Sequence, residues 1–330
     1  MKRAITTFLK AAVGISLLVF LLSKTDLSEI WALVKASRFE FLLLAVLAYI
    51  ASIVVISFRW RLLLYAHHMK VSVHSLVIYY FIGFFVNNFL PTSIGGDIVR
   101  TLDLARKSGR RAESAASVLM ERVIGLTAIV FLALIGLLLV GRIDYKPRLF
   151  LVVFVFLGFL LILFVSIFYD LPLGGLKRWI QEIQFLEFGR RIKKLHGCLK
   201  LYRDSKNALG GVFFVSIVYQ LMNAVFVYCV SLTLGLGVKF YYFLLFVPLI
   251  GLVGFIPISI NAVGLREGGY VFLLARIERS SAEALSLALL VYAITLAVSL
   301  IGGFFFVVRK ESKTLKEAEP VVEMVEESPG

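Results

Sequence analysis

Long apolar runs, separated by short polar segments, make up most of this sequence. Six runs hold at least 18 residues with few charges: 5–22, 39–64, 115–140, 149–169, 208–234 and 284–308. A helix needs about 20 apolar residues to cross the roughly 30 Å hydrocarbon core of a bilayer. Each run therefore predicts a membrane-spanning helix. The first resembles a signal peptide, but residues 23–26 offer no small-residue cleavage site, so we expect it to be retained.

Two further apolar runs break into residues that disrupt helices. Residues 76–90 lead into Pro91-Thr92-Ser93-Ile94, and residues 240–260 contain Pro257-Ile258-Ser259-Ile260. Broken backbone is tolerated at membrane depth only where protein or a wet cavity covers it. An arginine follows nine residues after each proline, giving Pro-x-Ser-Ile-x5-Arg twice. Coincidence is one explanation, but an inverted internal repeat, typical of transporters with broken helices, is the better one.

The distribution of basic residues discriminates between two topologies. If every run spans, with the N-terminus inside, the cytoplasmic segments hold 14 Lys and Arg and the outer segments 20. If the two broken runs are re-entrant hairpins, the counts become 24 inside and 10 outside, with Arg122 left out of both schemes. Cytoplasmic segments are normally the more basic. The sequence therefore predicts an all-α polytopic membrane protein with about six spanning helices and two opposed re-entrant helical hairpins; eight spanning helices are the alternative.

Composition excludes an ordinary soluble enzyme. Hydrophobic residues make up 60% of the 330 residues and charged residues 17%, whereas soluble domains are about half apolar and a quarter charged. The formal net charge is +14. In a soluble protein this excess would suggest nucleic acid as a partner. In a membrane protein, basic loops that set orientation and contact anionic lipid explain it, so we expect no nucleic-acid partner.

Charged residues within the predicted membrane region are the strongest candidates for function, because an unpaired charge in hydrocarbon costs several kcal/mol. Asp97 and Arg100 lie three residues apart, so they share a face if a helix starts there. Glu121 and Arg122 interrupt an apolar run and point in different directions, so each needs a partner elsewhere. The obvious candidate pairs are Arg122 with Asp97, or Glu121 with Arg100, either as a structural lock or as contacts to a ligand.

The residues around both breaks complete a candidate site for a lipid head group. Backbone N–H groups near Gly95-Gly96 could form a nest for a phosphate or carboxylate, or could belong to an ordinary capped helix. Arg266-Glu267 mirrors the first hairpin from the opposite side. The candidate head-group residues are Asn87, Asn88, Ser93, Gly95, Gly96, Asp97, Arg100, Glu121, Arg122, Ser259, Arg266 and Glu267.

Other segments have simpler interpretations. Residues 176–206 carry apolar positions at steps of three and four among Lys and Arg, which predicts a basic amphipathic helix in the cytoplasmic interface, for anchoring or for docking anionic head groups. Arg59-Trp60-Arg61 is typical of an interfacial anchor. Three histidines, His67, His68 and His74, are expected at the surface rather than on a metal. Residues 311–330 predict a disordered acidic tail after a membrane domain that spans residues 1–310.

The sequence contains no Walker loop and no His-Glu-x-x-His motif. We therefore expect no cofactor and no ATP-driven pump. No catalytic motif is recognisable, so an enzyme is the less favoured class.

Three motifs, in order, resemble one family. They are Asn87 to Arg100, Glu121-Arg122-Val123, and Pro257 to Glu267. Over about residues 5–308 the chain is similar to the lysylphosphatidylglycerol synthase transmembrane family. The resemblance implies the flippase-like region of enzymes that make and translocate aminoacyl-phosphatidylglycerol. Stand-alone members also occur, some associated with polyprenyl-linked sugars.

The sequence departs from that family in two places. The bifunctional enzymes carry a soluble aminoacyl-transfer domain after the membrane region, whereas an acidic tail of 20 residues follows here, so we expect a stand-alone member without lysyl transfer. Ile260-Asn261-Ala262 also replaces an expected glycine-rich stretch.

The resemblance and the opposed hairpins together lead to the hypothesis of a lipid translocase that works without ATP hydrolysis. Its substrate would be an anionic, aminoacylated or polyprenyl-linked lipid. The alternatives are a membrane-embedded enzyme acting on lipid phosphates and an accessory subunit of a lipid-modifying enzyme. We expect a multi-pass protein of the cell membrane with both termini cytoplasmic. Membrane phospholipid or a polyprenyl-linked lipid is the expected partner, with a second copy and a lipid-modifying enzyme as further candidates.

Overall fold

The computed structural model describes residues 15–89, 95–140, 146–168, 197–254, 259 and 262–308. All regular structure within these residues is helical, which confirms the predicted all-α class. The main helices are α2 (Leu27–Lys35), α3 (Phe39–Ala66), α4 (Val73–Asn87), α5 (Gly95–Ser108), α6 (Arg111–Leu139), α7 (Lys146–Phe168), α10 (Lys206–Thr233), α11 (Phe240–Val253), α12 (Leu265–Leu274) and α13 (Ser281–Val308). Two 3-10 turns, η1 (Tyr202–Asp204) and η3 (Ala275–Ile277), adjoin them.

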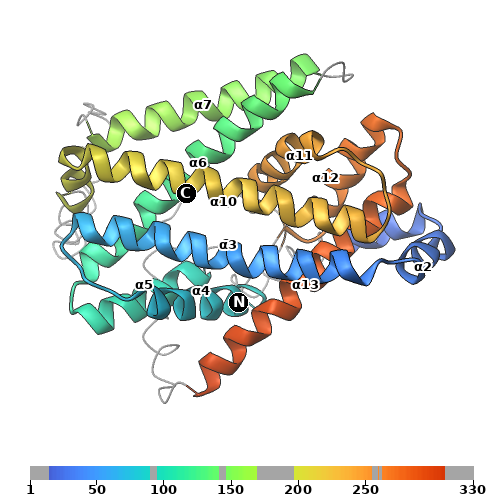
Figure 1. Ribbon diagram of the computed structural model, residues 1–330. Coiled ribbons are helices and arrows are strands. Elements are labelled where there is room, and N and C mark those ends of the chain that lie inside the picture. Colours follow the sequence, from blue (N-terminus) through green and yellow to red (C-terminus); the bar gives the residue numbers. More distant parts are fainter. Residues whose placement is uncertain are drawn as a thin grey trace, which may run out of the picture.

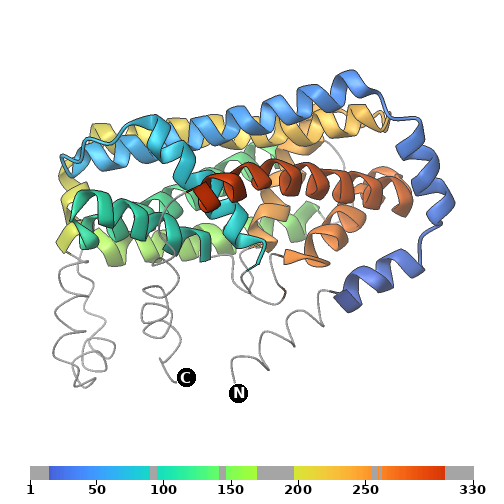
Figure 2. The same cartoon turned by 90° about the horizontal axis from the view of Figure 1, so that it is seen from below.

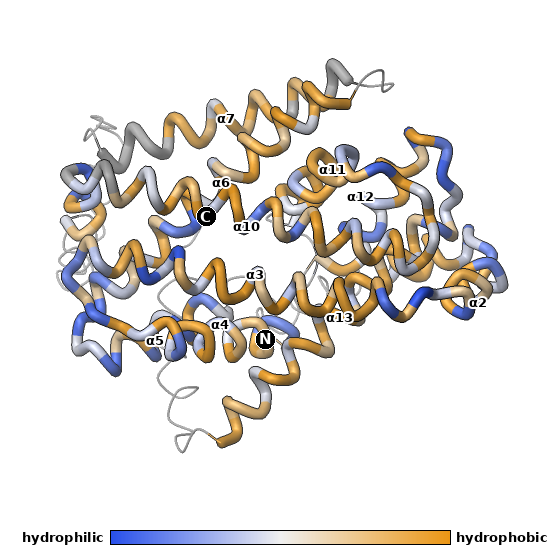
Figure 3. The backbone as a smooth tube through the Cα atoms, viewed as in Figure 1, coloured by the Kyte–Doolittle hydropathy of each residue, from blue (hydrophilic) through white to orange (hydrophobic). Residues whose placement is uncertain are grey.

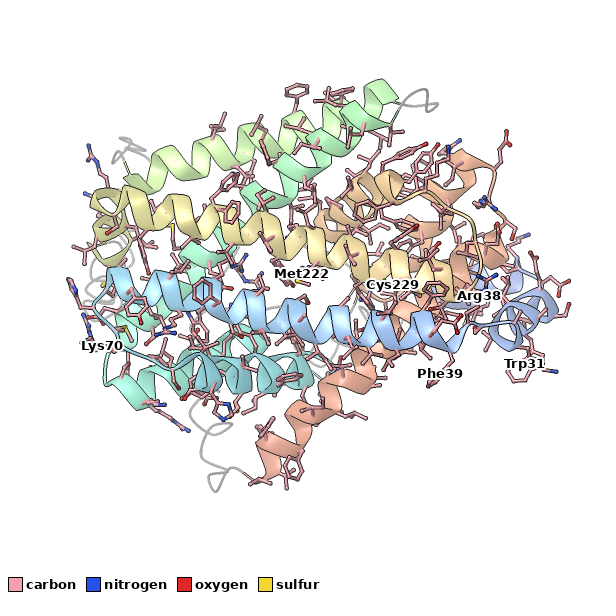
Figure 4. All side chains as sticks on the ribbon, in the orientation of Figure 1. Trp31, Arg38, Phe39, Lys70, Met222 and Cys229 are labelled. Atoms are coloured by element: carbon pink, nitrogen blue, oxygen red, sulfur yellow. The ribbon has the colours of Figure 1, made fainter. Side chains whose placement is uncertain are left out.

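The long helices run between two polar ends of the molecule, with mostly apolar residues in between (Figures 1 and 3). Figure 4 labels Lys70 at one end and Arg38 at the other, and we call these the Lys70 end and the Arg38 end. Helix α3 connects the two ends, and α10 lies beside it in both views (Figures 1 and 2). The N–H of Arg38 donates to the carbonyl of Thr233 over 2.9 Å, so the start of α3 meets the end of α10. The two helices are therefore antiparallel.

Four helices in the described part of the chain are long and apolar enough to cross a membrane: α3, α6, α10 and α13. At 1.5 Å per residue, a 28-residue helix such as α3 is about 42 Å long and exceeds the hydrocarbon thickness. Helix α7 is also apolar and lies along α6 (Figure 1). Residues 15–23 form the helical end of the first run. The protein is thus a multi-pass membrane protein whose long helices occupy the predicted runs.

The first broken run forms a hairpin of two short helices, α4 and α5, with 15 and 14 residues. Each is only about 22 Å long, too short to cross the hydrocarbon core. The ammonium of Lys107 donates to the hydroxyl of Ser75 over 2.8 Å, so the last turn of α5 lies beside the first turn of α4. Arg110 then donates to the carbonyl of His67 over 2.7 Å. The chain therefore returns to the Lys70 end, from which it started.

The second broken run forms a hairpin at the other end of the molecule. Helix α11 has 14 residues and α12 has 10. Gly237, before α11, lies beside the guanidinium of Arg279, after α12. Gly136, near the end of α6, packs on the backbone of Leu245 in α11. This hairpin starts and ends at the Arg38 end, so the two hairpins start from opposite ends, as the sequence predicted.

Close backbone contact holds the first hairpin in place. A Cβ on Gly96 would clash with the carbonyl of Gly83, so only glycine allows α5 to approach α4 at this point. A Cβ on Gly302 would similarly clash with the carbonyl of Phe81, where α13 crosses α4. The amide of Asn88 donates to the hydroxyl of Ser299 in α13 over 2.7 Å. Helix α4 and its C-terminal cap residue Asn88 are thus held between α5 and α13.

Two surface predictions at the Lys70 end are wrong. His67 is only 2% exposed, with its ring edge on the ring of Tyr202, and the centroids are 4.7 Å apart. The apolar positions of the amphipathic segment 176–206 were expected in the membrane interface, but Tyr202, one of them, is fully buried and its hydroxyl donates to the carbonyl of Leu63 over 3.2 Å. The reason is that residues 197–204 pack into a small apolar cluster with α3 and α6. Protein, rather than lipid, covers these side chains.

Several predictions fall outside the described residues. They concern Ser93, Asn261, residues 176–196 of the amphipathic segment and the tail at 311–330.

Candidate functional site

A cavity of ≈ 430 Å³ lies between the two hairpins and is lined by side chains from eight helices. Arg100 and Arg266, the arginines of the repeated motif, both line it. Its lining residues with polar or charged side chains are Tyr49, Arg59, Tyr80, Asn87, Asp97, Arg100, Glu121, Arg122, Tyr219, Gln220, Asn223, Arg266, Tyr270 and Thr295. The structure therefore brings the arginines that follow the two breaks, which are far apart in sequence, to one cavity. Figure 3 shows that the surrounding helices are mostly apolar.

Glu121 forms the centre of a buried ionic network. Its side chain is 1% exposed, and its carboxylate accepts from Arg59 Nη2 at 2.5 Å and from Arg100 Nη1 at 2.5 Å. The hydroxyl of Tyr80 donates to the same carboxylate. The guanidinium of Arg100 lies 4.6 Å from the centre of the Tyr80 ring and 4.8 Å from that of Trp60. These contacts offset the large cost of removing the charges from water.

Asp97 extends this network towards the cavity. Arg100 Nε donates to Asp97 Oδ1 over 2.9 Å, and Arg122 donates to Asp97 Oδ2. Both ion pairs expected from the sequence, Glu121 with Arg100 and Asp97 with Arg122, are therefore present. Opposite charges alternate through Arg59, Glu121, Arg100, Asp97 and Arg122, and join α3, α5 and α6. The first hairpin is bound to two long helices by this chain of charges.

Arg59 and Trp60 are not the interfacial anchor that the sequence suggested. Arg59 is 5% exposed and Trp60 is fully buried, with its Nε1 donating to Ser117 Oγ over 2.9 Å. Only Arg61 matches the prediction, since it bonds the exposed hydroxyl of Tyr65. An Arg-Trp-Arg run near the end of an apolar block is typical of anchors. However, α3 continues to Ala66, so Arg59 lies about two turns inside the helix, and Glu121 likewise lies nearly three turns inside α6.

The second hairpin contributes Arg266 to the cavity. Its guanidinium lies 5.2 Å from the centre of the Tyr292 ring, and its Nη2 is buried without a hydrogen-bond partner among the described residues. Glu267 has a different role. Its carboxylate accepts from the N–H of Gly264 over 2.6 Å and so caps α12, which begins after Gly264 at a φ of 81°. Glu267 does not line the cavity.

The remaining candidate residues divide between the cavity and the supporting structure. Asn87 lines the cavity, and its side-chain oxygen accepts from the N–H of Gly96 over 2.7 Å. That N–H is one of the groups proposed for an anion nest, so it is already used. Gly95 and Gly96 are buried at the start of α5. Ser259 is 5% exposed and lies outside the cavity lining.

Sequence reasoning missed the face that α10 presents to the cavity. Tyr219, Gln220 and Asn223 line it, and Ser216 on the same helix accepts from Arg59 Nη1 over 3.3 Å. Ser216, Gln220 and Asn223 are spaced by four and three residues, so they share one helical face. This polar stripe within an apolar run was a signal for a cavity-lining helix.

Comparison with known proteins assigns the chain to a family. The family described as "Lysylphosphatidylglycerol synthase TM region" matches residues 7–303. The chain is also 26% identical to the UPF0104 membrane protein PH1989 of Pyrococcus horikoshii over 134 residues, which is 40% of each protein. The alignment thus spans less than half of that relative. Because the family match extends from the first apolar run into α13, this chain belongs to the lysylphosphatidylglycerol synthase transmembrane-region family.

Proposed function

We propose that this protein moves an anionic, aminoacylated or polyprenyl-linked lipid between the two leaflets of the cell membrane without ATP hydrolysis. One observation carries the proposal: two half-length hairpins from opposite ends present their arginines to one cavity. A polar head group needs such a path, because charges and unsatisfied polar groups are expensive in hydrocarbon. The acyl chains would remain in the surrounding lipid while the head group passes through the cavity.

Membership of the family supports the same role, because its name refers to an enzyme whose product is a phospholipid. The sequence has no nucleotide-binding loop. Movement would therefore be downhill or coupled to an ion gradient. We propose that the Lys70 end faces the cytoplasm and that both termini are cytoplasmic, because cytoplasmic segments are normally the more basic.

Reconstitution into vesicles tests the proposal. Acyl-labelled phosphatidylglycerol, lysyl-phosphatidylglycerol and a polyprenyl phosphate would each be followed between leaflets by the accessibility of the label to a membrane-impermeant quencher. We expect at least one lipid to move faster than in empty vesicles. Arg266→Gln should slow it at least about tenfold, which corresponds to the loss of one charge-assisted hydrogen bond. Arg61→Gln, which lies outside the cavity lining, is the matched control and should keep the wild-type rate.

The same vesicles distinguish the rival functions. Chemical turnover of the lipid, detected by mass spectrometry, would indicate a lipid-phosphate enzyme. No movement of any of the three lipids, with the protein correctly inserted, would contradict translocation. A partner enzyme whose activity requires this protein would then favour an accessory subunit.

A further inference from the structure

In the cavity, the negative charges are paired more completely than the positive charges. This difference affects which lipid head group the cavity can bind. Among the described residues, the lining includes four arginines and two carboxylates, Arg59, Arg100, Arg122, Arg266, Asp97 and Glu121, and therefore has a formal net charge of two positive. The hairpin breaks outside the described residues, 90–94, 255–258 and 260–261, contain no ionisable side chain in the sequence. They cannot reverse this balance.

Both carboxylates are already neutralised by protein groups. Glu121 accepts from Arg59, Arg100 and Tyr80, and Asp97 accepts from Arg100 and Arg122. A cationic head group, such as a lysyl ester, would have to displace a buried arginine before it could reach either carboxylate. It would also meet the net positive charge of the lining. Breaking a buried ion pair is costly, because the released partner remains buried and uncompensated.

The unused hydrogen-bonding capacity of the cavity is cationic. Arg266 Nη2 is buried and has no hydrogen-bond partner within the described part of the chain. Guanidinium groups bind phosphate oxygens through short, charge-assisted hydrogen bonds. A phosphate placed at this nitrogen would satisfy an otherwise unsatisfied donor. It would also reduce the net positive charge of the lining.

Besides its charged and apolar side chains, the cavity lining includes polar side chains that carry no charge. Tyr49, Gln220 and Tyr270 contribute hydroxyl and amide groups, and none of them takes part in the ionic network. Such groups can donate to ester oxygens, and can both donate to and accept from hydroxyls. They suit the uncharged part of a head group.

We infer that the cavity selects a lipid phosphate whose head group is otherwise uncharged, and that it discriminates against aminoacylated lipid. Arg266 supplies the phosphate contact. This inference rests on the proposed function and narrows its substrate class. Lysyl-phosphatidylglycerol, the product that the family name suggests, would then be a poor ligand, because lysyl esterification makes the head group of phosphatidylglycerol net positive.

Equilibrium binding tests the inference separately from transport. The purified full-length protein in detergent would be titrated with four lipids of identical acyl chains: phosphatidylglycerol, phosphatidic acid, lysyl-phosphatidylglycerol and phosphatidylcholine. Glycerol 3-phosphate would test a soluble phosphate. We expect the two anionic lipids to bind at least about tenfold more tightly than the lysyl ester, which is about 1.4 kcal/mol. Glycerol 3-phosphate should bind more weakly than either anionic lipid.

Variants tie this preference to the cavity. Arg266→Gln should abolish most of the tenfold preference, whereas Arg266→Lys should keep part of it because the charge remains. Arg279→Gln is the matched control: Arg279 forms a part-buried pair with Glu283, lies outside the cavity lining and should bind like wild type when changed. Arg266→Lys retains the cation. If it keeps part of the preference, position 266 tolerates substitution, and the loss in Arg266→Gln is then due to the missing charge rather than to misfolding.

Several results would overturn the inference. Lysyl-phosphatidylglycerol binding as tightly as phosphatidylglycerol would do so, and an unchanged preference in Arg266→Gln would remove the role of Arg266. Glycerol 3-phosphate binding as tightly as the lipids would make a soluble phosphate the ligand instead. Selective binding without transbilayer movement would contradict the proposed function and leave this inference standing. Equal movement of anionic and lysylated lipids would support the proposed function and contradict this inference.

Discussion

The two hairpins share a sequence pattern but satisfy their polar groups in different ways. In the first, Arg100 is held between Glu121 and Asp97, and Asn88 at the end of α4 donates to Ser299 in α13. In the second, Glu267 caps its own helix and Arg266 retains an unpartnered nitrogen within the described residues. The comparison shows that arginines at matching positions of the two Pro-x-Ser-Ile-x5-Arg motifs have different surroundings. Arg100 is part of the ionic network that holds the first hairpin, whereas Arg266 is the residue that we propose for the phosphate contact.

The largest expected effect comes from breaking the lock of the first hairpin. Glu121→Gln removes the carboxylate that Arg59 and Arg100 share and leaves two buried cations under-compensated. We expect a loss of about 3–5 kcal/mol of stability, measured by thermal or denaturant unfolding in detergent. Glu267→Ala, in the second hairpin, removes only a helix cap and should cost about 1 kcal/mol.

A part-buried carboxylate outside the ionic network provides the control for this pair. Glu113→Gln breaks the ion pair with the part-exposed Arg110 and should lower the stability by only about 1 kcal/mol. If Glu121→Gln were no more destabilising than Glu267→Ala, the contrast between a charge-locked and a backbone-capped hairpin would be wrong.

A smaller effect is expected from adding one methyl group to a glycine of each hairpin. In the first, Gly96→Ala would press its Cβ into the carbonyl of Gly83 and force α4 and α5 apart, at a cost of about 1–3 kcal/mol. In the second, the nearest atom to a Cβ on Gly251 is Ile129 Cδ1 at 4.0 Å, so Gly251→Ala should be tolerated. Unfolding of both variants in the same detergent measures the difference. Equal destabilisation would show that the two hairpins are packed alike.

The smallest effect concerns pH at the base of the first hairpin, outside the spanning helices. Burial, with a contribution from Arg110, holds the pKa of His67 below its ordinary value of 6.5. The unfolded chain therefore binds a proton at a higher pH than the folded protein does. Stability is fully present above pH 6.5 and declines as the pH falls through the folded pKa, by at most about 1.4 kcal/mol per pH unit.

Two variants isolate this contribution. His67→Phe keeps an aromatic ring beside Tyr202 and should flatten the acid side of the stability profile measured between pH 7.5 and 5. His74→Phe, an exposed site, should leave the profile unchanged. An identical acid slope in wild type and His67→Phe would rule out a neutral, buried His67.

The sequence predicted the architecture well because hydrocarbon imposes strict rules on it. Apolar runs long enough to span predicted α3, α6, α10 and α13. The two breaks, each with one proline, predicted the paired short helices. The partners of Glu121 and Arg122 were also predictable, because charges at membrane depth must pair and few partners were available.

The rest of the site could not be predicted, because it depends on tertiary packing. Arg59 lies near a helix end in sequence, and only the fold shows that Glu121 faces it. His67 is polar and follows a helix, yet Tyr202 covers it from a distant segment. The uncharged groups of α10 form a recognisable stripe, but which cavity they line depends on how α10 packs against α3 (Figure 1).

The central claim, that the two hairpins enter from opposite sides, can be tested most directly by side-specific labelling. Single cysteines at His74, Lys107, Lys239 and Ser280, in a background with Cys198 and Cys229 replaced by serine, would be treated with a membrane-impermeant maleimide in oriented vesicles. These positions lie at the start and end of each hairpin. The structure predicts that positions 74 and 107 label from one side and positions 239 and 280 from the other. Labelling of positions 74 and 107 from opposite sides, or of all four from the same side, would contradict the account.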